Sequence, residues 1–141
     1  MLVNPTYLRS FLPCLVFTAA CAASSDSALR APLDTDFQLG VGQAAFVAET
    51  DLRLGFAAVT SDSRCPKGEA CFSAGDGVVR IWMQVNGGEQ VEHDLHTARQ
   101  GPKFADQAGY RVHLLALEPL PVSGIETAAE SYVATFRATR K

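Results

Sequence analysis

The sequence predicts an all-β fold on three observations. Apolar side chains recur at every second position along seven short segments, the pattern of strands with one buried face. Gly, Pro, Asn and Asp gather between these segments, where the chain must turn. No segment shows the long 3.6-residue stripe of an amphipathic helix. We therefore expect an antiparallel, immunoglobulin-like β-sandwich of about seven strands, with a small barrel as the alternative.

The alternation starts near residue 36 and runs to the end of the chain. The positions that follow this alternation are Phe37 and Leu39; Phe46 and Ala48; Leu52, Leu54, Phe56 and Ala58; Val79, Ile81, Met83 and Val85; Val91, His93 and Leu95; Tyr110, Val112, Leu114 and Ala116; and Tyr132, Ala134, Phe136 and Ala138. The turn signal at Asn86-Gly87 predicts a hairpin that joins strands 78–86 and 89–95, because both residues tolerate a positive φ. Helical candidates are short, at 97–107 and 125–131.

Composition and charge narrow the class of protein. Hydrophobic residues make up 48% of the chain and charged residues 19%, which is typical of a globular domain. The formal net charge is −3, and basic residues are scattered apart from Arg137, Arg140 and Lys141. A surface that tracks phosphates needs clustered Lys and Arg, so we expect no nucleic-acid partner.

The N-terminal residues have the layout of an exported bacterial protein. Arg9 precedes a short apolar run, and Thr18-Ala19-Ala20-Cys21 resembles the site at which a signal peptide is cleaved and the new N-terminal Cys is lipidated. The run is shorter than the roughly 20 residues that span a bilayer as a helix. We expect a signal peptide at 1–20, a flexible tether at 21–35, a folded domain at 36–141, and a lipid at Cys21 that anchors the protein in the cell envelope. Ordinary cleavage nearby, which would release a soluble secreted protein, is the alternative.

Two of the four cysteines remain for the folded domain. Cys14 lies in the apolar run, and Cys21 would be used by the expected lipidation. Cys65 and Cys71, separated by five residues, are expected to form a disulfide in an oxidising compartment. The spacing fits neither the usual zinc-ligand pair nor the Cys-x-x-Cys of redox enzymes.

A resemblance to a family centres on the same segment. Asp62-Ser63-Arg64-Cys65-Pro66, a second Cys shortly after it, Tyr110, Val112, Pro119, Pro121 and Tyr132 resemble a group of small uncharacterised bacterial lipoproteins. Where those proteins often carry a Trp before a Gly, this chain has Phe72-Ser73-Ala74-Gly75. The resemblance spans residues 37–139. It implies a fold and a location in the cell envelope, but no catalytic or binding activity.

The candidate binding residues lie in two places. Four of them belong to the disulfide segment: Arg64, Lys67, Glu69 and Phe72. A disulfide ring would make this segment rigid and so lower the entropy cost of binding a partner. Arg64 could also form a fork with a carboxylate, a structural role. Arg80 and Trp82 share one face of a predicted strand, and an exposed Trp beside an Arg is typical of interface hot spots. The alternative is that Trp82 packs under a loop or under the Cys65–Cys71 ring.

No catalytic pattern appears, so the sequence favours a non-enzymatic binding or structural module without a cofactor. Its partner would be an envelope protein or glycan. One alternative is a protease inhibitor that presents Lys67 within the Cys65–Cys71 loop. Another is periplasmic copper or zinc binding through His93, His96 and His113, although a strand would point His93 and His96 to opposite faces.

Overall fold

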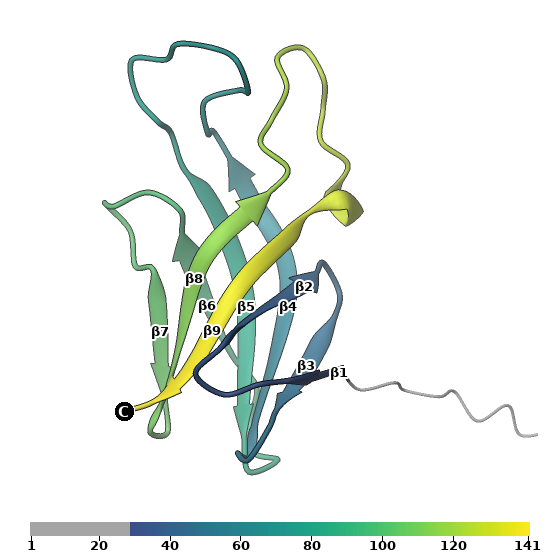
Figure 1. The fold of residues 1–141 in the computed structure, drawn as a ribbon, viewed down its shortest axis with the longest axis vertical. Coiled ribbons are helices and arrows are strands. Elements are labelled where there is room, and N and C mark those ends of the chain that lie inside the picture. Colours follow the sequence, from purple (N-terminus) through teal and green to yellow (C-terminus); the bar gives the residue numbers. More distant parts are fainter. Residues whose placement is uncertain (1–28) are drawn as a thin grey trace, which may run out of the picture.

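The computed structural model describes residues 29–141 and shows two β-sheets packed face to face (Figure 1). One sheet has five strands in the order β1 (Leu29–Ala31), β3 (Ala44–Val47), β4 (Leu52–Asp62), β5 (Gly77–Val85) and β6 (Val91–His96). The other has four, in the order β2 (Asp36–Gly40), β9 (Val133–Arg140), β8 (Tyr110–Glu118) and β7 (Phe104–Gln107). A short 3₁₀-helix, η1, covers Ala129–Ser131.

The all-β prediction is confirmed, with every one of the seven expected strands present. Two details differ from the expectation. The described part holds nine strands, and the five-stranded sheet is mixed because β1 runs parallel to β3. The strand order also differs from the arrangement of an immunoglobulin constant domain, so the likeness is limited to two packed sheets.

The folded part begins earlier than the sequence indicates. Leu29–Ala31 lies in the segment expected to be a flexible tether, yet it pairs with β3, and Ala31 is buried in the core. Of the two helical candidates, 97–107 contains β7 and no helix, whereas 125–131 ends in η1. The signal-peptide, Cys14 and Cys21 predictions lie outside the described residues.

Alternating side chains build the core between the sheets. Along β5, Val79, Ile81 and Met83 are fully buried while the residues between them are half-buried on the outer face. Phe56 of one sheet meets Phe136 of the other edge to face, with ring centroids 6.0 Å apart. This geometry is favourable for aromatic pairs, and it joins the two sheets near the centre of the core.

The predicted hairpin is confirmed. Asn86 and Gly87 have φ values of 53° and 66°, and the amide of Gly88 donates to the carbonyl of Val85 at 3.0 Å. The hairpin joins β5 to β6 at one end of the sandwich. It lies with the other short turns, at the bottom of Figure 1.

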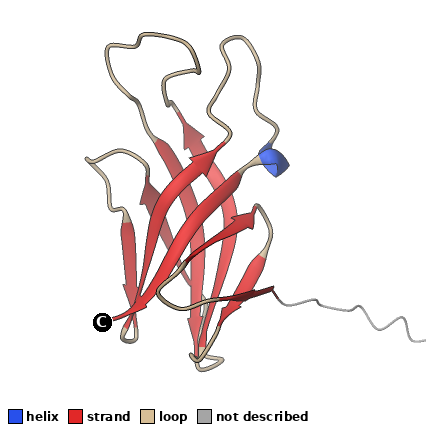
Figure 2. Ribbon diagram, in the orientation of Figure 1, coloured by secondary structure: helices blue, strands red, loops and turns tan. Residues whose placement is uncertain are grey.

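The longer connections gather at the opposite end. Residues 63–76 join β4 to β5, residues 97–103 join β6 to β7, and residues 119–132 join β8 to β9. Figure 2 shows these three segments as the tan loops above the strands. We call this end the loop end, and residues 63–76 the disulfide loop.

Candidate functional site at the loop end

A covalent bond and a short ladder fix the disulfide loop. Cys65 and Cys71 are disulfide-bonded, as predicted. At the stem, the amide of Ser63 donates to the carbonyl of Asp76 at 2.7 Å, and that of Cys65 to Ala74 at 2.9 Å. The amide of Lys67 donates to the carbonyl of Pro121 at 2.9 Å, which ties the ring to the 119–132 loop. The loop is therefore braced along its length and against its neighbour.

A buried ion pair lies beneath these loops. The guanidinium of Arg64 forms a fork with the carboxylate of Asp62, at 2.8 Å from Nε and 2.7 Å from one terminal nitrogen. Both side chains are only 8% exposed. The hydroxyl of Tyr132 donates to the same carboxylate at 3.0 Å.

Arg64 also holds the end of β8. Its terminal nitrogens donate to the carbonyl of Leu117 and, at 2.6 Å, to the carbonyl of Pro119. One side chain thus connects the stem of the disulfide loop with the start of the 119–132 loop. The structural role foreseen for Arg64 is confirmed, and its donors are used within the protein.

The pKa of Asp62 reflects this arrangement. Burial alone would raise it, but the hydrogen bonds from Arg64 and Tyr132 and the charge of Arg64 outweigh burial and lower the pKa below its ordinary value of 3.8. Because the folded-state pKa is the lower one, the ionised carboxylate stabilises the fold above the unfolded-state pKa. That contribution is lost as the pH falls through the folded-state value.

We therefore expect acidification to weaken the fold partly through Asp62. Urea unfolding between pH 6 and pH 3 should show a loss of stability in the natural protein, and a smaller loss in Asp62→Asn, which has no carboxylate to titrate at this position. The Asp94→Asn variant, which removes an exposed carboxylate paired with Arg80, is the control and should keep most of the loss. Equal pH dependence in Asp62→Asn and the natural protein would contradict the assignment.

A second polar cluster anchors the 97–103 loop. Nδ1 of His96 lies 2.6 Å from a carboxylate oxygen of Asp76, and the amide of Ala98 donates to the other oxygen at 2.9 Å. Burial would raise the pKa of Asp76, but its hydrogen bonds to His96, Ala98 and Thr97, with the charge of His96, lower it. Asp76 sits at the stem of the disulfide loop, so this cluster couples two of the three loops.

Large apolar side chains are exposed around this end. Phe72 is fully exposed and Ile125 is 66% exposed, while Leu120 and Val122 are each exposed by more than two fifths. They come from the disulfide loop and from the 119–132 loop, which the bond between Lys67 and Pro121 holds together. Leu120, Val122 and Ile125 were not singled out from the sequence, although large apolar residues in a Pro- and Gly-containing turn were a usable signal.

A pocket of about 560 Å³ opens between the three loops. Its wall includes Cys65, Ala74, Thr97, Arg99, Lys103 and Leu120. We call it the basic pocket, because Arg99 and Lys103 line it and no Asp or Glu does. Neither Arg99 nor Lys103 attracted attention in the sequence, since nothing in their spacing shows that two other loops close around them.

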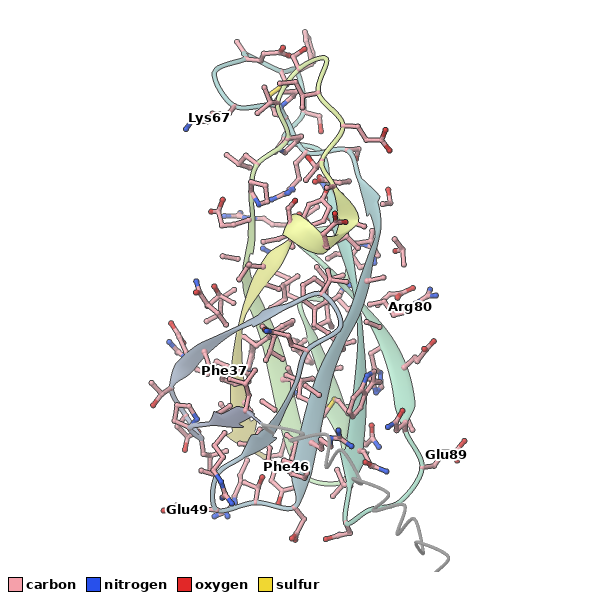
Figure 3. All side chains as sticks on the ribbon, turned by 90° about the vertical axis from the view of Figure 1, so that its right-hand side faces the viewer. Phe37, Phe46, Glu49, Lys67, Arg80 and Glu89 are labelled. Atoms are coloured by element: carbon pink, nitrogen blue, oxygen red, sulfur yellow. A yellow bond between two sulfur atoms is a disulfide. The ribbon has the colours of Figure 1, made fainter. Side chains whose placement is uncertain are left out.

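The predicted binding residues do not form one site. Lys67, Glu69 and Phe72 are exposed on the disulfide loop, whereas Arg80 lies along the sheet face (Figure 3). Arg80 forms an ion pair with Asp94 at 2.8 Å. Trp82 is half-buried on the same face, and a Cβ added to Gly55 would lie 2.0 Å from its ring. The ring therefore covers bare backbone, away from the loop end.

The histidines are similarly dispersed. His96 binds Asp76, and His93 lies 3.4 Å from the side-chain oxygen of Gln107. The ring of His113 lies tilted against that of Phe104, with centroids 5.7 Å apart. In the part of the chain that the structure describes, no three His, Cys, Asp or Glu side chains are grouped so as to hold a metal ion. The copper or zinc alternative gains no support from these positions.

The shape of the ring bears on the inhibitor alternative. Lys67 is exposed, as an inhibitor would need, but Gly68 has φ +83° and the amide of Glu69 donates to the carbonyl of Pro66 at 3.1 Å. The chain thus reverses direction at Lys67-Gly68. A segment that adds to a protease as an extended strand requires straight backbone, so this turn favours the binding-module hypothesis.

Removing the disulfide should loosen the loop end without abolishing the fold. The double variant Cys65→Ser/Cys71→Ser should have a free energy of unfolding about 2 kcal/mol lower than that of the oxidised protein, because the unfolded chain regains the freedom of the open ring. Urea unfolding measures the difference. The natural protein under reducing conditions is the matched control and should resemble the variant; equal stability of the oxidised and reduced forms would contradict the estimate.

No protein-family model matches the sequence, and no curated protein or solved structure matches the chain. The resemblance to small bacterial lipoproteins therefore stays a prediction. Among residues 29–141, no helix is long and apolar enough to cross a membrane.

Proposed function

We propose that this protein is an exported, non-enzymatic binding module that docks a protein partner through its loop end. One observation carries the proposal. Phe72, Leu120, Val122 and Ile125, all large and apolar, are exposed on two loops that are tied to each other and to a buried ion pair. Exposed apolar side chains that gather on a braced surface are typical of interaction sites.

Rigidity supports the same reading. A flexible loop loses conformational freedom when it binds, and that loss reduces the affinity. The disulfide loop is closed by a covalent bond, and its neighbours are held by Arg64 and Asp76. Much of the conformational entropy of these loops is therefore already lost when the protein folds, and little more is lost when a partner binds.

The proposal includes the cellular address. We propose that Cys21 carries a lipid and that the domain is held in the bacterial cell envelope, as in the lipoproteins it resembles. β1 lies toward the end of the sandwich opposite the disulfide loop (Figure 1). A tether that leads into β1 would leave the loop end free to meet a partner. We propose a likeness to immunoglobulin domains only in that both are β-sandwiches that present binding loops at one end.

The experiment compares two surfaces of the same protein. The full chain is expressed in its native host, recovered with its partners, and each recovered protein is quantified by mass spectrometry. Phe72→Ser/Ile125→Ser should reduce the recovery of specific partners by about tenfold or more, since hot-spot aromatic and aliphatic anchors dominate binding energy.

A matched control comes from the other end of the fold. Phe46 is 45% exposed and lies near the lower end of the sandwich in Figure 3, so Phe46→Ser removes an exposed ring away from the loop end. This variant should recover the same partners as the natural protein. If Phe46→Ser and Phe72→Ser/Ile125→Ser reduce the same partners equally, the loop end is not the docking surface.

A further inference from the structure

The basic pocket lies between all three loops of the loop end, and Leu120 of the proposed docking surface is part of its wall. The disulfide loop contributes Cys65 and residues 73–75, the next loop contributes residues 97–100 and Lys103, and the last contributes Leu120. Its volume of about 560 Å³ falls within the range of pockets that hold small ligands or side chains. A partner that docks on Leu120 would therefore also meet the wall of this pocket.

Two positive charges at this pocket have no partner within the described chain. Arg80, Arg111, Arg137 and Lys141 each form an ion pair with an Asp. Arg99 and Lys103 form none among residues 29–141, and no acidic side chain lines the pocket. Arg64 also reaches the wall, but Asp62 already neutralises its charge.

The loop that carries these two cations is held in place. His96 donates its amide to the carbonyl of Pro102 at 2.8 Å, and the amide of Leu114 donates to the carbonyl of Lys103 at 2.8 Å. Gly101 lies against the imidazole of His96 so closely that an added Cβ would come within 2.1 Å of the ring. The backbone positions of Arg99 and Lys103 are thus set before any ligand binds, which favours recognition of a group of fixed geometry.

The rest of the wall indicates what accompanies the negative charge. Leu120, Ala74 and Cys65 give an apolar surface next to the cations. Inorganic anions would leave that surface unused. A carboxylate attached to an apolar residue uses both parts, with charge-assisted hydrogen bonds to the guanidinium and ammonium groups.

We propose that the basic pocket binds a carboxylate of the partner polypeptide, either an acidic side chain or a C-terminus, together with an adjacent apolar side chain. This rests on the proposed function and names the part of the partner that is recognised. Arg99 and Lys103 pair the carboxylate, and Leu120 and Ala74 contact the apolar group. The site selects for charge, so a neutral amide of the same shape should bind poorly.

The test uses defined peptides and the purified protein with its disulfide intact. The probes are the tripeptide acetyl-Leu-Phe-Glu with a free C-terminus and its uncharged counterpart acetyl-Leu-Phe-Gln-amide, followed by ¹⁵N–¹H NMR titration. The acidic peptide should shift the amide signals of Ala74, Gly75 and residues 97–100 at about millimolar concentration, a weak affinity suited to a short peptide with two carboxylates and one ring. The uncharged peptide should not.

Two variants with matched chemistry decide the role of the cations. Arg99→Gln/Lys103→Gln should weaken binding of the acidic peptide about tenfold, because both charge-assisted contacts are lost. Lys67→Gln removes a positive charge from the same end but outside the pocket wall, and should change the affinity by less than about twofold. Their NMR spectra without peptide report that both variants are folded.

The proposal is overturned if the acidic peptide does not bind, or if the uncharged peptide binds equally well. It is also overturned if the Lys67 variant and the Arg99/Lys103 variant weaken binding equally, or if inorganic phosphate binds as tightly as the acidic peptide. If the peptides fail while Phe72→Ser/Ile125→Ser still loses its partners, the pocket assignment fails and the proposed function stands. If the peptides bind but that variant retains its partners, the proposed function fails instead.

Discussion

Arg64→Met should lower the free energy of unfolding by about 3 kcal/mol and release the loop end from the strands. The variant would leave the carboxylate of Asp62, only 8% exposed, without its ion pair. It would also leave the carbonyls of Leu117 and Pro119 without the guanidinium donor. Removing one member of a buried pair is costly because the remaining charge stays buried and unpaired. Urea denaturation monitored by circular dichroism measures the loss.

A double variant separates the ion pair from simple loss of side-chain volume. Asp62→Leu/Arg64→Met removes both charges and replaces them with apolar groups, so its loss should be smaller than that of Arg64→Met alone. Arg64→Lys should also destabilise, because an ammonium cannot form the fork with Asp62 and still reach both carbonyls. A double variant that is less stable than Arg64→Met would contradict this account of the pair.

Phe136→Ala should cost about 4 kcal/mol, the largest effect we expect from a single substitution. Phe136 is fully buried and its ring meets Phe56 from the opposite sheet at 6.0 Å and Phe37 at 6.2 Å. Truncation would remove contacts that link the two sheets and leave a cavity between them. The midpoint of thermal or urea unfolding reports the change.

Phe46→Ala provides the comparison for that substitution. Phe46 is 45% exposed on the outer face, where the guanidinium of Arg53 lies 5.2 Å from its ring centroid. Its loss should lower the free energy of unfolding by less than about 1 kcal/mol. Similar losses for Phe46→Ala and Phe136→Ala would mean that the core is not organised as described.

The features that the sequence predicted well are local ones. Period-two alternation located the main strands, the Asn86-Gly87 turn located a hairpin, and two nearby cysteines located a disulfide. Each of these signals depends on residues that are close in the chain. The sequence also indicated that Arg64 could form a fork with a carboxylate, and the structure identifies that carboxylate as Asp62, two residues away.

What the sequence missed depends on distant residues. β1 is too short for a periodic pattern, and it becomes a strand only because β3 offers a parallel edge. Arg99 and Lys103 line a pocket only because loops far away in the sequence close around them. Trp82 was left between exposure and burial, and Gly55 on the neighbouring strand decides the matter by giving the ring a flat surface.

The most direct measurement is site-specific photo-crosslinking from the two ends of the folded domain. A benzophenone amino acid is placed at Phe72 or Ile125 of the loop end, and at Glu89 of the opposite hairpin, in the full chain within its native host. The account predicts the same discrete crosslinked partner from positions 72 and 125, and its absence from position 89. An identical set of adducts from position 89, or no discrete adduct from either loop-end position, would contradict the claim that the loop end is the binding surface.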